Sequence, residues 1–317
     1  NICSYIPDRD HEGYGISEQG IEFAASIDCQ LIIALDCGIR ALNMADLSKK
    51  KGIDLIICDH HIPGGILPKA YAVLDPKRKD CQYPFKELSG CGVAFKFLQG
   101  FCQQQRLDFE FLYKFLDLVA VSIASDIVPM IGENRILAHF GMKKINSQPL
   151  KSLQALIEIA GIKSPISISD VVFYIGPRIN AAGRLRHANE SVDLLISENS
   201  VQIRDFAQRL NEVNIKRQNI DQNITEEALR KIDQELPKSA KSTVLFNSKW
   251  HKGIVGIVAS RCIEHYFRPT IILTESNGVA TGSARSVEGF DIHAALGKCS
   301  DLLLQYGGHA FAAGISL

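Results

Sequence analysis

Two short apolar segments of the chain end in side chains that can bind a metal ion. Asp36 closes the segment at 31–35, and Asp59, His60 and His61 close a second one. Ligand sites of open parallel sheets collect at the carboxyl ends of strands, so we expect these four side chains in one crevice. Mixed carboxylate and imidazole ligands suit divalent cations such as manganese, and paired cations of this kind favour phosphoryl chemistry. The sequence therefore predicts a metal site here.

Each of these features also has a plainer explanation when taken alone. An aspartate at a strand end is often a helix cap, and a histidine pair often lies on the surface or in the core. Asp126 follows the apolar stretch at 111–125, so we expect it near the interior. It is either a helix C-terminal residue or cap, or a third carboxylate of the metal site. A buried carboxylate needs hydrogen bonds or a compensating cation.

Three glycine-containing segments have the composition of loops that contact oxyanions. Guanidinium groups match phosphate oxygens, and small residues let the backbone approach a ligand. None of the three is a Walker or dinucleotide-binding fingerprint, so a nucleotide cofactor is not indicated. The segments are GPRINAAGR at 176–184, TGSARS at 281–286 and YGGHAFAAG at 306–314, which contains His309.

The elements that position these residues alternate between strands and helices. Such alternation predicts an α/β fold with a mainly parallel sheet. In the first two-thirds of the chain, strands are expected at 31–36, 54–58 and 71–75, and helices at 38–51, 92–105 and 111–125.

The segment at 201–233 lacks Gly and Pro and has apolar residues at steps of three and four, which predicts one long helix. Its apolar side consists of Phe206, Leu210, Val213, Ile220, Ile224 and Leu229. A second α/β pattern follows Pro237, with strands expected at 242–246 and 270–274 and helices at 254–266 and 291–306. The predicted layout is a larger α/β domain, a helical connector and a smaller α/β domain.

Composition limits the class of protein. A chain of 317 residues favours two domains, and no apolar run approaches the roughly 20 residues that cross a bilayer. The formal net charge is zero, so a nucleic-acid site would be a local basic groove. None of the nine cysteines forms a Cys-x-x-Cys pair, and Cys37, Cys58 and Cys262 lie in apolar segments. Reduced thiols are therefore expected, which indicates the cytoplasm.

Several motifs together resemble the DHH phosphoesterase family, and within it the exonucleases specific for single-stranded DNA. They are Asp59-His60-His61 after Asp36, the segments GPRINAAGR and GGHAFAAG, and IPDRDHEGYG, LDCG and WHKGIVGIVASR. The resemblance extends along nearly the whole chain. It implies a DHH domain, a helical connector and a DHHA1 domain that clamp single-stranded DNA, with boundaries at 1–198, 199–236 and 237–317.

The resemblance also implies roles for individual residues. Asp36, His60 and Asp126 would hold Mn²⁺ or Mg²⁺, and Asp36 would bridge two ions. His61 would face the scissile phosphate, and Asp59 would orient a histidine. The contacts to DNA would be Arg9, Arg184, Gln218, Ser283, Arg285, Gly307, Gly308 and His309.

The function implied by the resemblance is 5′-to-3′ hydrolysis of single-stranded DNA by a two-metal mechanism, in recombination and repair. A single-strand-binding protein or a helicase would be the protein partner, and no membrane partner is expected. Two alternatives remain. One is a phosphodiesterase of short oligonucleotides or cyclic dinucleotides, and the other is a DNA-binding scaffold without catalysis.

One family motif is not found where it is expected. The family has an Asp-x-Asp pair on its first strand, whereas Asp8-Arg9-Asp10 lies inside the IPDRDHEGYG segment and follows no strand pattern. We therefore expect the genuine pair before Asn1, so that this chain carries only part of its metal shell and binds metal poorly or does not catalyse. The chain is likewise expected to continue beyond Leu317.

Overall fold

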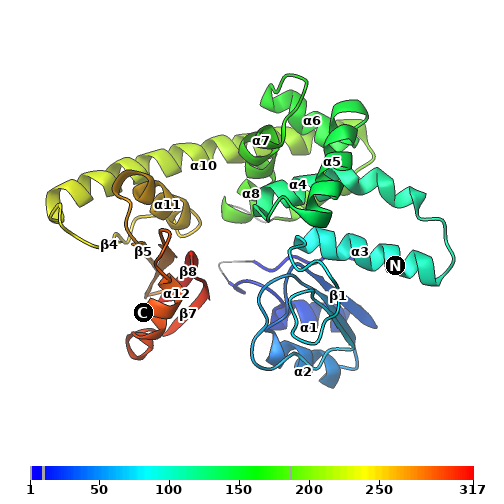
Figure 1. Cartoon of the computed structure of the whole chain (residues 1–317), viewed down its shortest axis with the longest axis horizontal. Coiled ribbons are helices and arrows are strands. Elements are labelled where there is room, and N and C mark those ends of the chain that lie inside the picture. Colours follow the sequence, from blue (N-terminus) through cyan, green and yellow to red (C-terminus); the bar gives the residue numbers. More distant parts are fainter. Residues whose placement is uncertain (1, 9–10, 186–187) are drawn as a thin grey trace. The chain divides into compact units, whose positions relative to one another are not determined.

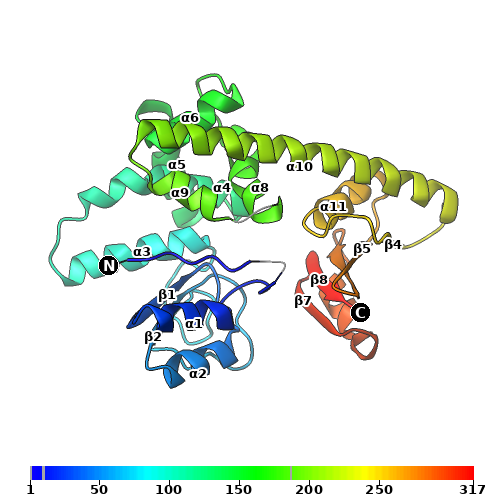
Figure 2. The ribbon, with the colours of Figure 1, turned by 180° about the vertical axis from the view of Figure 1, so that it is seen from behind.

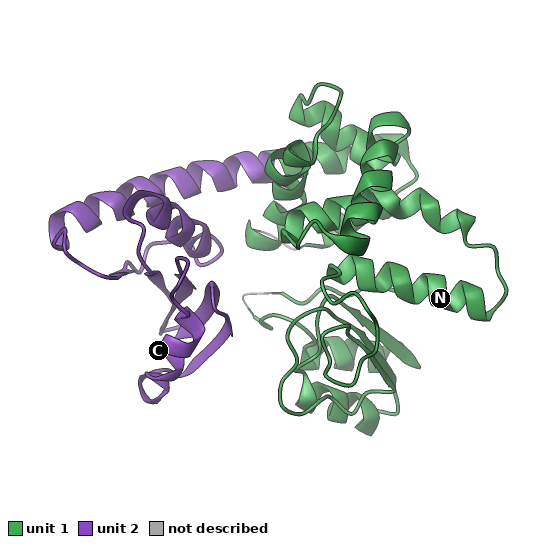
Figure 3. Ribbon diagram, viewed as in Figure 1, with its two compact units in different colours: residues 1–211 green, residues 212–317 purple. Residues whose placement is uncertain are grey.

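A computed structural model describes residues 2–8, 11–185 and 188–317. The chain divides into two compact units, unit 1 at residues 1–211 and unit 2 at residues 212–317 (Figure 3). Unit 1 contains a parallel sheet and a group of helices, and unit 2 contains a second sheet. This confirms the predicted α/β class with a smaller second sheet domain. The three-part division with a separate connector at 199–236 stays a prediction.

The sheet of unit 1 is parallel, with the strand order β1-β2-β3. Its strands are β1 (Leu31–Leu35), β2 (Asp54–Cys58) and β3 (Ala72–Leu74). Successive side chains of a strand point to opposite faces. Ile57 therefore packs with α2 (Leu42–Lys50) on one face, while Cys58 packs with α3 (Gly90–Gln104) on the other. Figure 2 shows α1 (Glu18–Ser26) and α2 beside β1 and β2.

A group of helices completes unit 1 (Figure 1). Its core is formed by fully buried aliphatic side chains such as Leu153, Leu156 and Ile175. The stretch at 111–125 is helical as expected, because its apolar residues pack against α5 and the neighbouring helices. The elements are η1 (Glu110–Phe115), α4 (Leu116–Asp126), α5 (Gly132–Ser147), α6 (Lys151–Ala160), α7 (Ile168–Asp170), η2 (Val171–Ile175), α8 (Gly176–Leu185) and α9 (Asn189–Ile196).

The long helix predicted at 201–233 is confirmed as α10 (Ser200–Glu235). Leu210, Val213 and Ile224 are buried, as the three- and four-residue steps indicate. The boundary between the two units falls within this helix, between Asn211 and Glu212. The first part of α10 packs in the core of unit 1, and the remainder belongs to unit 2.

Unit 2 contains a five-stranded sheet with the order β4-β5-β6-β8-β7. β4 and β5 are parallel, and all other neighbours are antiparallel. The sheet is therefore mixed. Its elements are β4 (Thr243–Phe246), α11 (Val255–Tyr266), β5 (Thr270–Ser276), β6 (Val279–Arg285), α12 (Ile292–Gly297), η3 (Ser300–Leu302), β7 (Gln305–His309) and β8 (Ala312–Ser316).

The helix expected at 291–306 is wrong in its second half. α12 ends at Gly297, and Gln305 begins β7, whose residues pair with β8. The run of leucines before Gln305 has the composition of a helix. In the structure only Ser300–Leu302 form a short helix, η3, and the residues from Gln305 onward pair with β8 instead.

The three segments interpreted as loops are largely regular structure. GPRINAAGR forms α8, where Ala181 and Ala182 are fully buried and Pro177 lies in the first turn, a position that tolerates proline. TGSARS lies mostly on β6, and YGGHAFAAG forms β7, a turn and the start of β8. Small residues therefore serve close packing here as well as ligand access.

All nine cysteines are free thiols, as the absence of paired motifs predicts. Cys58 and Cys262 are buried, and burial raises the pKa of each thiol to about 11, so both are protonated at neutral pH. Cys37 is only half-buried. Among the described helices, none has both the length and the apolar character that crossing a membrane requires.

Candidate metal centre and substrate-binding surface

Three predicted metal ligands meet at the carboxyl end of the unit 1 sheet. His60 follows β2, Asp36 follows β1, and Asp126 is the last residue of α4. Nε2 of His60 lies 3.1 Å from Oδ1 of Asp36 and 3.2 Å from Oδ2 of Asp126. One imidazole nitrogen therefore lies between two carboxylates, and the three come from three different elements.

The hydrogen bond of His60 determines which nitrogen faces these carboxylates. Nδ1 lies 2.9 Å from the carbonyl oxygen of Leu88, which can only accept, so Nδ1 carries the proton and donates it. Nε2 is buried and has no hydrogen bond of good geometry within the described parts of the chain. Nε2 of His60 is therefore the ring nitrogen that faces the two carboxylates, and a cation bound between them would take the place of a proton on it.

The electrostatics of the cluster favour positive charge. Burial alone would lower the pKa of His60, but the adjacent carboxylates of Asp36 and Asp126 outweigh burial and raise it. Burial and the charge of Asp36 raise the pKa of Asp126. Both shifts reduce the net negative charge, which a divalent cation would also do. The donor set of two carboxylates and one imidazole suits manganese or magnesium.

Asp126 is more exposed than expected. Its side chain is 42% exposed, whereas the apolar stretch before it predicts a position near the interior. The reason is that α4 ends at this residue and Ile127 turns the chain with a left-handed backbone, φ +54°. Asp126 is both a helix C-terminal residue and a neighbour of His60, so the two interpretations left open by the sequence are compatible.

Asp59 orients His60 and His61 by accepting hydrogen bonds from both residues. Its side chain is 1% exposed, and Oδ1 accepts hydrogen bonds from the amide and Nδ1 of His61, at 3.2 and 2.7 Å. Oδ1 also accepts from the His60 amide at 2.7 Å, and Oδ2 accepts from the Ile39 amide at 2.9 Å. The ligand atoms of Asp36, His60 and His61 lie within 4.8 Å of one another. His61 is thus oriented toward the same crevice.

The Asp59→Asn variant is expected to lose stability. Burial by itself would raise the pKa of Asp59, but hydrogen bonds from His61 and Ile39 outweigh it and lower the pKa to about 2. The charged form therefore stabilises the fold above pH 4, and this contribution is lost as pH falls from about 4 to about 2. The introduced amide would face a backbone donor, which costs about 1–3 kcal/mol. Urea unfolding between pH 3 and 7 measures both effects.

The variant also predicts a change in the pH dependence of unfolding. Wild type should lose more free energy of unfolding between pH 4 and pH 3 than the variant does, because the variant has no carboxylate to protonate at this site. Equal pH slopes in the two proteins would show that Asp59 does not carry this contribution.

The segment that precedes α3 shapes the site and was not predicted from the sequence. Ser89 caps α3 by accepting a hydrogen bond from the Gly92 amide, at 3.1 Å, and Leu88 supplies the carbonyl that orients His60. A Cβ atom at Gly90 would lie 2.1 Å from Oδ1 of Asp36, so only glycine fits. A serine followed by glycines before an apolar run is a helix-start signal that points to this position.

Asp75 was also missed, although it is the last residue of the third predicted strand. It is 3% exposed, and burial raises its pKa to about 6, with the Lys77 amide opposing and the charge of Asp59 reinforcing that effect. All three strands of the unit 1 sheet therefore end in an aspartate. Oδ2 of Asp75 has no hydrogen-bond partner within the described residues.

Arg184 is half-buried on α8. Arg9 lies outside the described residues. The neighbouring Arg178 bonds Asn211 through Nε at 3.0 Å and the Tyr174 carbonyl, so it serves the packing of the helices. Asp8 lies in no strand and accepts a hydrogen bond from the His11 amide, and its place outside the metal site stays a prediction.

The unit 2 sheet brings most of the remaining predicted contacts onto one face. Ser283 of β6 pairs with Gly314 of β8, and Gly314 pairs with Gly307 of β7. Arg285 is in register with His309 in the same way, through one residue of β8. Residues directly opposite one another share a face. Only the small residues Ala312 and Gly314 of β8 lie between β6 and β7 in these rows. Arg285 and His309 are two strand spacings apart, which is about 10 Å.

The face with these side chains is open at β7 and β8. Gly307, His309 and Gly314 are exposed, and the opposite face packs on α12. Gly308 pairs with Ala313 and so lies on that opposite face, where its backbone has φ +148°. Gln218 is exposed on α10. Its contact with substrate, like that of Gly308, stays a prediction.

Arg285 is suited to bind an anion. Its guanidinium donates to Oγ of Ser283 at 2.5 Å and to the Ala284 carbonyl at 2.9 Å, and no described carboxylate forms an ion pair with it. Burial lowers the pKa of Arg285, which nevertheless stays charged. A phosphate oxygen would supply the missing countercharge.

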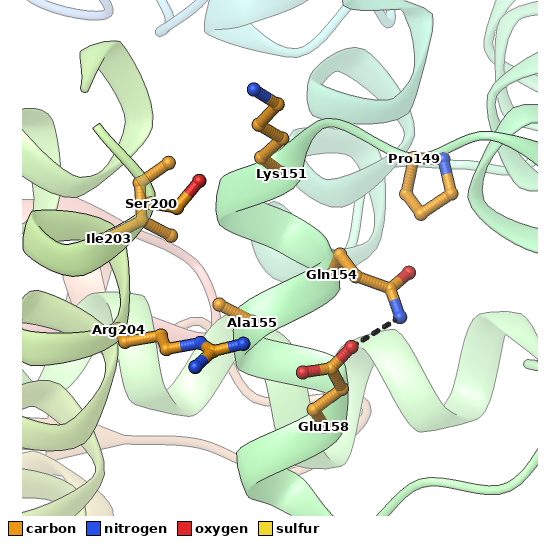
Figure 4. A pocket seen from close by; sticks show the side chains of 8 residues that line it. All are labelled: Pro149, Lys151, Gln154, Ala155, Glu158, Ser200, Ile203 and Arg204. Carbon is orange, nitrogen blue, oxygen red and sulfur yellow. Dashed lines mark hydrogen bonds between the residues drawn. The ribbon is translucent and has the colours of Figure 1, made fainter. Parts of the chain in front are cut away.

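A cavity of about 230 Å³ lies elsewhere in unit 1, between α6 and the start of α10 (Figure 4). A hydrogen bond of 2.8 Å joins Gln154 and Glu158 at its wall. None of the predicted site residues lines this cavity, so it is separate from the metal cluster. Its lining consists of Pro149, Lys151, Gln154, Ala155, Glu158, Ser200, Ile203 and Arg204.

Comparison with known proteins identifies the class to which this fold and site belong. The model of the DHH family, N-terminal domain, matches residues 1–123, and the model of the DHHA1 domain matches residues 238–317. The structure superimposes on a crystal structure of exonuclease RecJ bound to manganese with a TM-score of 0.81 and 31% identity, covering 99% of this chain and 77% of that one. The chain therefore belongs to the DHH family, with a DHHA1 domain in its second unit.

Within this family, the chain is similar along its length to proteins named single-stranded-DNA-specific exonuclease RecJ. The Bacillus subtilis protein is 39% identical over 99% of this chain, and the Escherichia coli protein is 35% identical over 100%. RecJ from Thermus thermophilus in complex with Mn²⁺ superimposes with a TM-score of 0.84 and 30% identity, over 94% of this chain and 44% of that one. The chain spans 39% and 58% of the length of the two curated relatives.

Proposed function

We propose that this chain is the catalytic core of a RecJ-type exonuclease that hydrolyses single-stranded DNA from its 5′ end. The observation that carries the proposal is the position of Nε2 of His60, which lies 3.1 Å from Oδ1 of Asp36 and 3.2 Å from Oδ2 of Asp126. Similarity to RecJ proteins over nearly the entire chain supports the same proposal.

In this proposal Asp36, His60 and Asp126 hold Mn²⁺ or Mg²⁺. When bound, the cations would neutralise charge on the phosphodiester and activate water. Asp59 keeps Nδ1 of His61 protonated and its ring oriented, so Nε2 of His61 faces the crevice and can contact the scissile phosphate. No covalent nucleophile from the protein is required.

Single-stranded DNA would bind through its phosphates. Ser283, Arg285 and His309 share one face of the unit 2 sheet, and Arg285 lacks a described acidic partner. Contacts to phosphate are independent of base, so binding should show little sequence preference and weaken steeply as salt rises. A single-strand-binding protein or a helicase would be the protein partner, and the free thiols support a cytoplasmic location.

The test is degradation of end-labelled oligonucleotides by the complete protein in manganese. A 5′-label should appear at once as a mononucleotide, while a 3′-label should pass through progressively shorter products. Blunt duplex DNA of the same sequence serves as the matched control and should resist cleavage. Chelation of the metal should stop the reaction, because the carboxylate cluster alone offers no catalyst.

Other outcomes would select the alternatives. Faster cleavage of a dinucleotide than of long single strands would indicate a small-substrate phosphodiesterase. Binding of single strands without any cleavage in manganese would indicate a scaffold. Either result would overturn the proposal.

A further inference from the structure

The segment that connects β4 to α11 is tied to α10 by one carboxylate. Oε1 of Glu227 accepts a hydrogen bond from Nδ2 of Asn247 at 2.6 Å, and Oε2 accepts one from Nε1 of Trp250 at 2.9 Å. Trp250 is only 4% exposed. Both oxygens are used, so Glu227 fixes the segment at two points. We call residues 247–254 the Trp250 segment.

The Trp250 segment continues rigidly into α11. Oγ1 of Thr274, on β5, donates to the Trp250 carbonyl at 2.6 Å. The His251 carbonyl accepts from the Ile254 amide at 2.9 Å, and Ile254 is fully buried. The position of the first turn of α11 therefore depends on the position of this segment.

That first turn contacts the predicted phosphate-binding side chains. A Cβ atom built on Gly256 would lie 2.9 Å from Nη2 of Arg285 and 3.1 Å from Oγ of Ser283. The backbone of α11 thus forms one wall of the space that holds the guanidinium. A small displacement of this turn would force Arg285 to move, or would leave it without that wall.

We propose that Glu227 is a positioning residue for the phosphate contacts of Ser283 and Arg285. It acts through the Trp250 segment and the first turn of α11. The inference rests on the proposed function and deepens it, because it assigns α10 a part in substrate binding beyond joining two domains. A purely structural role would lower stability without any specific coupling to Arg285.

The test is a double-mutant cycle on binding of fluorescein-labelled oligo-dT to the complete protein in EDTA, followed by fluorescence anisotropy. Glu227→Ala and Arg285→Ala should each weaken binding about tenfold, as expected for one charge-assisted hydrogen bond. The double variant should be about tenfold weaker, and not about a hundredfold. The slope of log affinity against log salt should fall by about 0.7 in all three variants, the value for one phosphate.

Two controls separate positioning from folding. Glu226→Ala removes an exposed neighbour whose carboxylate accepts a hydrogen bond from Nε2 of Gln222 at 3.0 Å, and this variant should bind like wild type. Glu227→Gln should bind oligo-dT weakly. Its single side-chain oxygen can accept from only one of the two donors, Nδ2 of Asn247 and Nε1 of Trp250, and its NH2 group would face the other. Adding Asn247→Asp supplies an acceptor for that amide and should restore binding to within about twofold of wild type.

Trp250 provides a direct readout, since it is the only tryptophan of the chain. The indole is 4% exposed in the folded chain. Its emission should therefore shift to longer wavelength in Glu227→Ala, which releases the Trp250 segment. The emission should return to the wild-type wavelength in the double variant Glu227→Gln/Asn247→Asp. This measurement reports on the Trp250 segment in the absence of DNA.

The outcomes are distinguishable. Additive losses in the cycle, or failure of Asn247→Asp to rescue Glu227→Gln, would overturn the positioning role. If Glu227→Ala does not fold, the comparison of Glu227→Gln with the double variant Glu227→Gln/Asn247→Asp tests the positioning role in the same way. If wild-type protein does not bind oligo-dT, the proposed function itself fails.

Discussion

His60→Ala is expected to weaken manganese binding by at least about a hundredfold and to abolish manganese-dependent cleavage. Loss of a side chain that only orients a ligand typically costs 10–100-fold, and loss of the ligand itself should cost more. Nε2 of His60 is buried and lies between Asp36 and Asp126, and the Leu88 carbonyl fixes the orientation of the ring through Nδ1. Isothermal titration of Mn²⁺ into the complete protein measures the affinity directly.

The matched control for this variant is His139→Ala, because His139 is an exposed histidine on α5 in the same unit. It should leave both affinity and cleavage unchanged. The Leu88 carbonyl loses its donor in His60→Ala, so circular dichroism must show that the fold is retained, with an expected cost of about 1–3 kcal/mol. Folded His60→Ala protein with nearly wild-type manganese affinity would exclude His60 as a ligand.

Gly90→Ala is expected to disrupt the metal site although position 90 carries no ligand. The added methyl group would lie 2.1 Å from Oδ1, 2.4 Å from Cγ and 2.6 Å from Cβ of Asp36. The whole side chain of Asp36 must therefore move, and it starts from a strained backbone with φ +62°. We expect manganese affinity to fall at least about tenfold, with a loss of stability of about 1–3 kcal/mol from overpacking.

Gly100→Ala on the same helix is the matched control. A Cβ atom at Gly100 meets no heavy atom within 4 Å, so this substitution should raise stability by about 0.5–1 kcal/mol through helix propensity alone. Manganese affinity should not change. Equal behaviour of the two variants would mean that Gly90 does not shape the position of Asp36.

Local sequence patterns determined the elements that carry the metal site. Asp36 and Asp59 each follow a short run of β-branched or aliphatic residues, and that pattern alone places them at strand ends. The parallel order of β1 and β2 follows from the helix between them, and it brings both strand ends to one edge. The long helix α10 was predictable for the same reason, because its signal is local and uninterrupted by Gly or Pro.

Contacts between distant residues were decided only by the tertiary structure. The residues Gln305–His309 form β7 and not the end of a helix because they pair with β8, which in turn pairs with β6 on the other side of α12 in the sequence. The need for glycine at position 90 comes from the contact with Asp36, which is 54 residues away in sequence, and no local pattern around Gly90 indicates that contact. The same holds for Glu227, whose two acceptors find donors on a segment about 20 residues away.

The sequence by itself thus determined which side chains could hold a metal and on which strands they lie, since residue type and periodicity are local properties. Only the tertiary structure decided how they are oriented: the Leu88 carbonyl selects the nitrogen of His60, and Gly90 makes room for Asp36. Orientation depends on hydrogen bonds and close packing between segments far apart in the chain. Such contacts form only when the whole unit has folded.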